Sequence, residues 1–264
     1  MRGHGSLGRG FALVLAAALT ACSGDAPAPA SGFRDYQPAT LAEAVLLRNR
    51  IAVENFLALG TDPNEPEPDG TTPLMRAVHG RLPEIAELLI AASADVSAAN
   101  TYGVTALYIA ARAGDAVATG QLLAAGASAN TALPAGETVL MTAAKAGNAD
   151  VVRALLTGGD NGVSLLRLRE QRAAAQVAEA AGYVVPANPT APVNYADVNA
   201  RERWYGRTAL MIAAAEGHAE IVQLLIDAGS DVNAVDEEGS SALSLARSNG
   251  HLDVAASLAE AGAR

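Results

Sequence analysis

Hydrophobic positions recur in pairs of short segments whose spacing is that of amphipathic helices. In each pair, a threonine or serine precedes a segment with leucine two positions later and small residues after it. A turn containing glycine follows in most copies, and then a second segment carries isoleucine or valine and a pair of leucines at helical spacing. Glycine ends most of these second segments, where the backbone needs a positive φ. The pattern predicts pairs of helices joined by tight turns and followed by extended polar loops.

The helix pairs recur at a fixed interval. Thr72, Thr105 and Thr138 are evenly spaced along the chain, and the same interval separates Thr208 from Ser241. A period of this length is typical of stacked repeats, in which each unit buries its apolar faces against its neighbours. We expect one buried row of leucines from the first helices and another from the leucine pairs of the second helices. The first row is Leu74, Leu107, Leu140, Leu210 and Leu243, and the second is 88–89, 122–123, 155–156 and 224–225.

The repeats resemble the ankyrin family. Segment 208–234, TALMIAAAEGHAEIVQLLIDAGSDVNA, reproduces the family pattern TPLHxAA…GH…IVxLLLxxGADVN almost in full. Six copies in register, including a weaker first copy that begins at Ala39, cover about 39–159 and 196–264. The resemblance implies an all-α solenoid of about six helix–turn–helix repeats, with β-hairpin-like loops between them and a role in binding other proteins.

Two positions depart from the repeat pattern in ways that affect stability. Ser93 stands where later copies have glycine at the end of the second helix. Gly120 lies inside the predicted second helix of the third copy, where glycine costs up to about 1 kcal/mol relative to alanine. We therefore expect lower local stability in these two repeats.

The period is interrupted once. Thr138 and Thr208 lie about two periods apart instead of one, and the excess lies in an insertion at about 160–195 and in one extra residue of loop 201–206. The first part of the insertion, 163–181, has the pattern of an amphipathic helix, and the rest is Pro-rich. The insertion is a degenerate seventh repeat, a tolerated loop extension, or a contact surface for a partner.

Segment 1–21 has the arrangement of an export signal. Arg2 and Arg9 give a basic start, 11–19 is apolar, and small residues follow. The apolar segment is shorter than the roughly 20 residues that a membrane-spanning helix needs. Residues 1–21 are therefore predicted to be a signal peptide that is removed from the mature protein.

The end of this signal resembles the lipobox of bacterial lipoproteins. It reads Leu-Thr-Ala-Cys at 19–22, and the resemblance implies cleavage before Cys22 and attachment of a diacylglycerol to its sulfur. Residues 22–38 are small, polar and Pro-rich, as in a flexible tether, and 39–264 form the repeat domain. By the enterobacterial sorting rule, Ser23 in place of aspartate slightly favours the outer membrane.

Charge and cysteine content exclude several kinds of partner and binding site. The formal net charge of −10 becomes −12 if Arg2 and Arg9 are removed, so the chain should repel nucleic acid and anionic lipid headgroups. Cys22 is the only cysteine, which leaves no disulfide and no cysteine-based metal site. No later segment reaches about 18 consecutive apolar residues, so membrane contact is expected through the lipid alone.

Candidate catalytic and metal-binding groups are sparse. His218 and His251 occupy the Gly-His position of the repeat, where the resemblance implies a structural hydrogen bond. The acidic segment 61–70 lacks the ligand spacing of an EF-hand, because Pro66 occupies a ligand position. Without a nucleophile, phosphate-binding or zinc motif, the sequence predicts no catalytic residue, cofactor, metal or small-molecule substrate.

Loop 201–206 has the composition of a binding hot spot. Trp204 and Tyr205 are adjacent, with Arg203 and Arg207 beside them, although the rings could instead pack on the insertion. The ankyrin resemblance implies that partners contact the loop tips and the exposed face of the first helices. In this chain those positions are Thr101, Tyr102, Val104, Arg112, Glu137, Lys145, Trp204, Tyr205, Arg207, Glu216, Glu237 and Glu238.

These observations favour a non-enzymatic, lipid-anchored module that faces the periplasm and binds an envelope protein as a scaffold or adaptor. One alternative is an inhibitor or immunity protein that neutralises a toxic periplasmic enzyme. Another is an enzyme whose site is built by the insertion.

Overall fold

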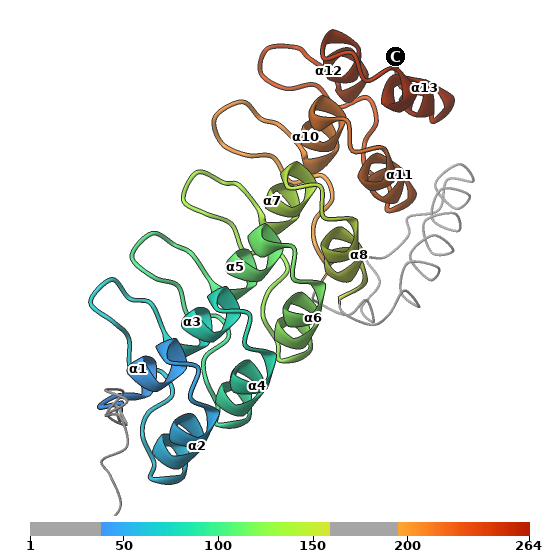
Figure 1. Cartoon of the computed structure of the whole chain (residues 1–264). Helices are drawn as coiled ribbons and strands as arrows, with labels where there is room; N and C mark the ends of the chain where they lie inside the picture. The colour runs from blue at the N-terminus through green and yellow to red at the C-terminus, as the bar shows by residue number, and fades with distance from the viewer. Residues whose placement is uncertain (1–37, 159–194) are drawn as a thin grey trace, which may run out of the picture. The chain divides into compact units, whose positions relative to one another are not determined.

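The computed structural model describes residues 38–158 and 195–264 (Figure 1). The predicted signal peptide, the tether other than Pro38, and the insertion other than Tyr195 lie outside these residues. The described part contains twelve helices in six consecutive pairs. The pairs are α1 (Leu41–Leu46) with α2 (Arg50–Ala58), α3 (Pro73–His79) with α4 (Pro83–Ala91), α5 (Ala106–Ala113) with α6 (Ala116–Ala124), α7 (Val139–Lys145) with α8 (Ala149–Thr157), α10 (Ala209–Glu216) with α11 (Ala219–Asp227), and α12 (Ala242–Ser248) with α13 (Leu252–Glu260).

Each first helix is capped by a threonine or serine, which in the last five repeats is the residue that marks the repeat and in the first is Thr40, one position after Ala39. The Thr105 side chain, for example, accepts a hydrogen bond of 3.2 Å from the backbone N–H of Tyr108, in the first turn of α5. This N-cap satisfies an N–H group that has no partner within the helix and contributes about 1 kcal/mol. The same bond occurs at Thr40, Thr72, Thr138, Thr208 and Ser241.

Glycine is required where the helices of neighbouring repeats approach closely. Gly147 follows α7 with φ +75°, and a Cβ atom there would lie 2.8 Å from Cε1 of His218 in the next repeat. The His218 ring in turn places Nε2 3.4 Å from the carbonyl oxygen of Lys145, and His251 Nε2 lies 3.1 Å from that of Ala215. Both histidines therefore contact the C-terminal end of the preceding first helix, which is the structural role expected for them.

Ser93 adopts the backbone conformation that glycine adopts in the later repeats. Its φ is +67°, in the left-handed region, whereas the equivalent Gly126 and Gly229 have φ of +96° and +83°. A side chain in this region costs roughly 1–2 kcal/mol. Gly120 lies inside α6, and a Cβ atom built on it would meet nothing within 4 Å. The expected lower stability of these two repeats stays a prediction.

The core is continuous from the first pair to the last. Neighbouring first helices contact one another, as do neighbouring second helices, and α7 packs on α10 although the insertion separates them in sequence. Figure 1 shows the pairs stacked in chain order. The expected row of buried leucines is confirmed, with exposures of 0–4% at Leu74, Leu107, Leu140, Leu210 and Leu243.

The prediction that both leucines of each pair in the second helices are buried was partly wrong. Leu88 and Leu224 are not fully buried, because they lie one position before the site that faces the core. In the last five repeats that site has a constant offset from the capping Thr or Ser. The buried row is Leu89, Leu122, Leu155, Leu225 and Leu258.

The repeat resumes in register where the described chain returns at Tyr195. The N–H of Ala196 donates to the carbonyl of Leu155 at 3.2 Å, as Ala127 does to Leu122 after α6. The Asn130 side chain donates to the carbonyl of Tyr195 at 2.9 Å and accepts from the N–H of Asp197 at 2.7 Å. Residues 195–200 thus replace the loop that would otherwise follow α8 directly.

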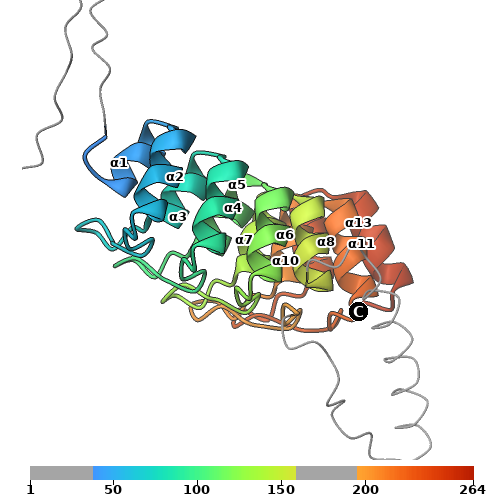
Figure 2. The ribbon, with the colours of Figure 1, turned by 90° about the horizontal axis from the view of Figure 1, so that it is seen from below.

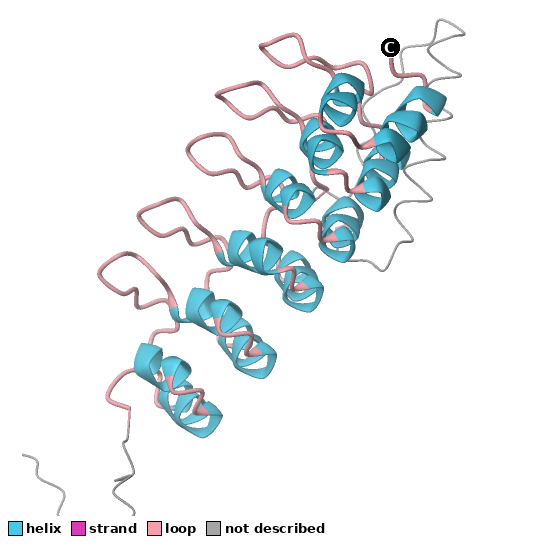
Figure 3. Ribbon diagram, turned by 45° about the horizontal axis from the view of Figure 1, so that its top comes forward, coloured by secondary structure: helices cyan, strands magenta, loops and turns pink. Residues whose placement is uncertain are grey.

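The loops between repeats form a row of hairpins on one side of the helices (Figures 2 and 3). Isolated antiparallel bridges, such as that between Ala99 and Thr105, close three of them. Adjacent tips are tied together by backbone hydrogen bonds: Arg203 donates to the carbonyl of Ala135 at 2.9 Å, and Glu237 to that of Tyr205 at 2.8 Å. Among the described residues, no helix is long and apolar enough to cross a membrane.

Candidate functional site

Glu202 organises the loop that carries the aromatic pair. Its carboxylate accepts hydrogen bonds from the backbone N–H groups of Trp204 and Tyr205, both at 2.6 Å, and of Arg207 at 3.2 Å. In the loop before α5, Asn100 accepts the equivalent bonds with a shorter side chain. Loop 201–206 is one residue longer than the loop before α5, and the glutamate side chain is one methylene longer than that of asparagine, so it can reach the same N–H groups. Burial raises the pKa of Glu202, but the three N–H groups and the Arg207 charge outweigh it and leave the pKa below its ordinary value.

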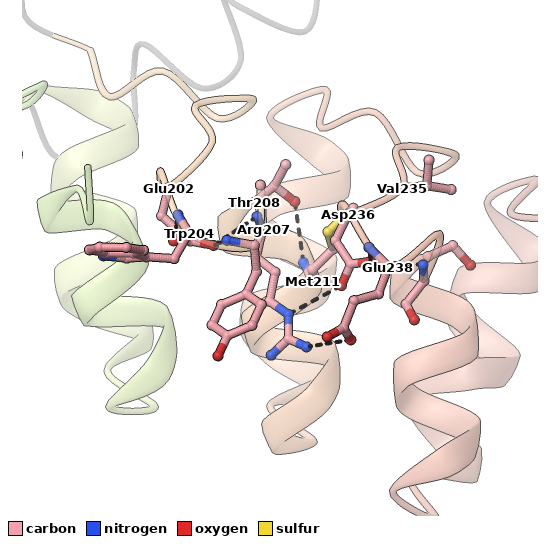
Figure 4. A network of polar contacts seen from close by, with 12 residues as sticks. Glu202, Trp204, Arg207, Thr208, Met211, Val235, Asp236 and Glu238 are labelled. Carbon is pink, nitrogen blue, oxygen red and sulfur yellow. Dashed lines mark hydrogen bonds and ion pairs between the residues drawn. The ribbon is translucent and has the colours of Figure 1, made fainter. Parts of the chain in front are cut away.

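Arg207 joins this loop to the next one (Figure 4). The centre of its guanidinium lies 5.1 Å from the centroid of the Tyr205 ring, within cation–π range. Its Nε donates to Oδ2 of Asp236 at 3.2 Å, and Nη2 lies 3.8 Å from Oε2 of Glu238. These contacts fix the guanidinium beside the aromatic pair.

Asp236 is the buried anchor of this network. Its side chain has no solvent exposure, and Oδ1 accepts from the N–H groups of Ser240 at 2.8 Å and Glu238 at 3.0 Å. Burial raises the pKa of Asp236, but the Ser240 N–H, the Arg207 guanidinium and the Glu238 N–H hold it below its ordinary value. The carboxylate therefore stays charged at neutral pH and holds Arg207 in place.

The two aromatic rings are largely open to solvent. Trp204 is 70% exposed and Tyr205 is 52% exposed. Figure 4 shows the indole extending away from Arg207 toward the preceding repeat. Large exposed aromatic rings held by ordered backbone are typical of protein-binding surfaces.

A groove of about 320 Å³ lies between this loop and the first helices α7 and α10. Ile212 and Ala215 of α10 contribute apolar atoms to its lining. Six of the twelve predicted partner-binding residues line it together: Glu137, Lys145, Trp204, Tyr205, Arg207 and Glu216. The arrangement combines aromatic rings, an apolar surface and charges of both signs, which suits a protein surface better than a reacting substrate.

Two more predicted residues line a second groove of about 320 Å³, over α3 and α5. Val104 and Arg112 contribute to it, and the remaining lining residues are His79, Tyr108, Ile109 and Ala113. Thr101 and Tyr102 are not in either groove. They occupy the exposed tip of the loop before α5, where Tyr102 is 70% exposed.

Glu237 and Glu238 occupy the exposed tip of the loop before α12. The Glu238 carboxylate lies beside Arg207, and the Glu237 backbone donates to the Tyr205 carbonyl. Both residues therefore contact the network around the aromatic pair from the following repeat. Cys22, the predicted lipid-attachment residue, lies outside the described residues.

Three residues that support these loops or line a groove were not indicated by the sequence as part of the candidate site. Glu202 and Asp236 fall at the position of Asn100 in their own loops, so aligning the loops would have shown their role as turn acceptors. His79 lies one repeat period before Arg112, and that period alone would have placed it on the same face. Within the two described stretches, no group of three or more His, Cys, Asp or Glu side chains could hold a metal ion.

Comparison with protein families agrees with the repeat architecture. A model of three ankyrin repeats matches residues 41–131 and 173–264, and a single-repeat model matches 135–164. Together they cover well over half of the chain, so the protein belongs to the ankyrin-repeat family. The repeats define a protein–protein interaction module.

Proposed function

We propose that the chain is a non-enzymatic scaffold or adaptor that binds an envelope protein through the groove between loop 201–206 and helices α7 and α10. The observation that carries the proposal is the gathering of six exposed or half-buried residues from two repeats around that groove. Aromatic and arginine side chains dominate the energetics of protein interfaces. Here the loop that presents them is held by Glu202 and Asp236, so little ordering cost is left for binding.

We also propose that a lipid on Cys22 tethers the module to a membrane, facing the periplasm, with the outer membrane slightly favoured. The signal-like arrangement of 1–21 and the lipobox-like 19–22 support this. Two or more acyl chains are needed for stable anchoring, which the diacylglycerol of such lipoproteins supplies. Cys22→Ser should release the protein from membranes or block its processing, as fractionation and mass spectrometry would show. A fully processed, membrane-bound variant would contradict the anchor.

Affinity capture from detergent-solubilised membranes tests the binding surface. Trp204→Ala should reduce recovery of a partner by roughly tenfold or more, since central aromatic residues contribute about 2 kcal/mol or more. Leu252→Ala is the matched control, because Leu252 is 72% exposed but lies on a second helix, α13. Equal recovery with wild type and Trp204→Ala, with helical content unchanged, would overturn the assignment of the groove.

A further inference from the structure

Three basic side chains occupy the same position in successive first helices. His79, Arg112 and Lys145 are spaced by the repeat period, and each lies in the last turn of its helix and is exposed. Cations near a helix C-terminus interact favourably with the helix dipole, which is one reason for their presence. However, the next first helix, α10, has Ala215 at this position and α12 has Ser248, so the fold does not require a cation there.

These three side chains have no acidic partner in the part of the chain that the structure describes. The ion pairs there involve other arginines, such as Arg76 with Glu67 and Arg207 with Asp236. A cation that has no ion pair within its own chain breaks none when it meets a carboxylate from another molecule. The three side chains are therefore available for intermolecular pairing.

The groove over α3 and α5 places two of these basic side chains beside apolar ones. His79 and Arg112 line it together with Val104, Tyr108 and Ile109, and no acidic side chain lines it. The chain as a whole has 28 acidic and 18 basic residues, so this groove differs in charge from the rest of the molecule. The groove beside Trp204, by contrast, is lined by three glutamates as well as Lys145 and Arg207.

We propose that the groove over α3 and α5 binds an acidic segment of the protein partner, in which an Asp or Glu side chain adjoins an apolar one. The carboxylate pairs with Arg112, whose guanidinium can engage both oxygens, and His79 adds a second donor. The apolar side chain packs on Val104 and Ile109. This assignment rests on the proposed protein-binding function and specifies the chemistry of the partner.

Charge elsewhere on the loop side favours a short segment over a larger polyanion. Glu237 and Glu238 are exposed at a loop tip, and the whole chain carries a net charge of −10. An extended anionic surface, such as a lipid bilayer or a nucleic acid, would meet these carboxylates as well as the cations. A peptide segment that enters one groove of about 320 Å³ avoids that repulsion.

Selection from a library of short random peptides tests the proposal. The full chain, solubilised in detergent, is the target, and binding of the selected peptides is then measured by fluorescence anisotropy. The selected peptides should carry Asp or Glu beside Leu, Ile, Val or Phe. Their affinity should fall at least about tenfold in Arg112→Glu. It should be unchanged in Arg247→Glu, which makes the same charge reversal at an exposed arginine of α12. Replacing the peptide acids with lysine should abolish binding to wild type and restore it to Arg112→Glu.

Several outcomes would overturn the proposal. Selected peptides rich in lysine or arginine, or peptides that bind Arg112→Glu as tightly as wild type, would show that the groove does not recognise acids. Loss of affinity only in Trp204→Ala would refute this inference and leave the proposed function standing. Failure to enrich any peptide would count against this inference, while membrane capture decides the proposed function separately. If a Cys22→Ser chain binds phosphatidylglycerol vesicles through Arg112, the occupant is a lipid surface instead.

Discussion

Replacing Asp236 with alanine should destabilise the protein and loosen the aromatic loop. The side chain is fully buried and accepts three hydrogen bonds, from the N–H groups of Ser240 and Glu238 and from Arg207 Nε. Alanine leaves all three donors without their acceptor. It also releases the guanidinium that lies against the Tyr205 ring.

The size of the effect follows from these contacts. A hydrogen bond to a charged group contributes about 1.5–3 kcal/mol, but donors that can recover water lose less. Glu238 is exposed and Ser240 is half-buried, so both N–H groups can be partly rehydrated. We expect a loss of about 2 kcal/mol in the free energy of unfolding for Asp236→Ala. Asp236→Asn should lose about 1 kcal/mol, because its Oδ1 still accepts from both N–H groups.

Urea unfolding of the chain, followed by far-UV circular dichroism, measures this difference. Asp231→Ala is the control, because the Asp231 side chain is exposed and accepts from the Asn233 N–H at 3.0 Å. The control should lose less than about 1 kcal/mol. If Asp236→Ala is no less stable than Asp231→Ala, the buried carboxylate does not hold the loop and the reasoning fails.

Further predictions concern the backbone and pH. Gly120→Ala and Ser93→Gly should each raise the free energy of unfolding by about 0.5–1 kcal/mol. The first replaces a helical glycine where there is room for a methyl group, and the second removes a side chain from a residue with left-handed backbone. A lower urea midpoint in either variant would contradict this reasoning. Gly147→Ala should lower the melting temperature and cost about 2 kcal/mol or more, because of its positive φ and the facing histidine ring; an unchanged melting temperature would rule this out. The pKa values of Glu202 and Asp236 are depressed in the folded state, so their stabilisation is complete above the unfolded values near 4 and is lost as the pH falls through the folded values. The urea concentration at the unfolding midpoint should therefore decrease as the pH is lowered below about 4. A midpoint that stays constant from about pH 7 to 3 would refute this.

The fold was largely predictable from the sequence, because the repeat period determines where the helices begin and which positions are buried. One constant interval located the capping residues of the last five repeats, on either side of the insertion, and the buried leucines of their first helices. In the first repeat it falls on Ala39, one position before the capping Thr40. The leucine pairs gave a wrong prediction at two repeats, because adjacent leucines on a helix point in different directions. The number of residues from the capping residue identifies which leucine of a pair faces the core. Counting from the capping residue, rather than from the pair, selects Leu89 over Leu88.

The candidate site was less accessible to sequence reasoning. Loop-tip and helix positions could be selected one by one, but their gathering depends on stacking across the insertion. Glu137 and Trp204 line one groove although the whole insertion separates them in sequence. The support that Asp236 gives from the following repeat depends on its burial, which composition does not reveal.

Site-specific photo-crosslinking in cells tests the central claim most directly, that the groove beside Trp204 binds a protein. Benzoylphenylalanine is placed at Trp204 in one variant and at Leu252 in another, two side chains that are 70% and 72% exposed on different sides of the repeats. The account predicts a discrete crosslinked protein from position 204 and none from position 252. Crosslinks of equal yield from both positions, or from position 252 alone, would contradict it.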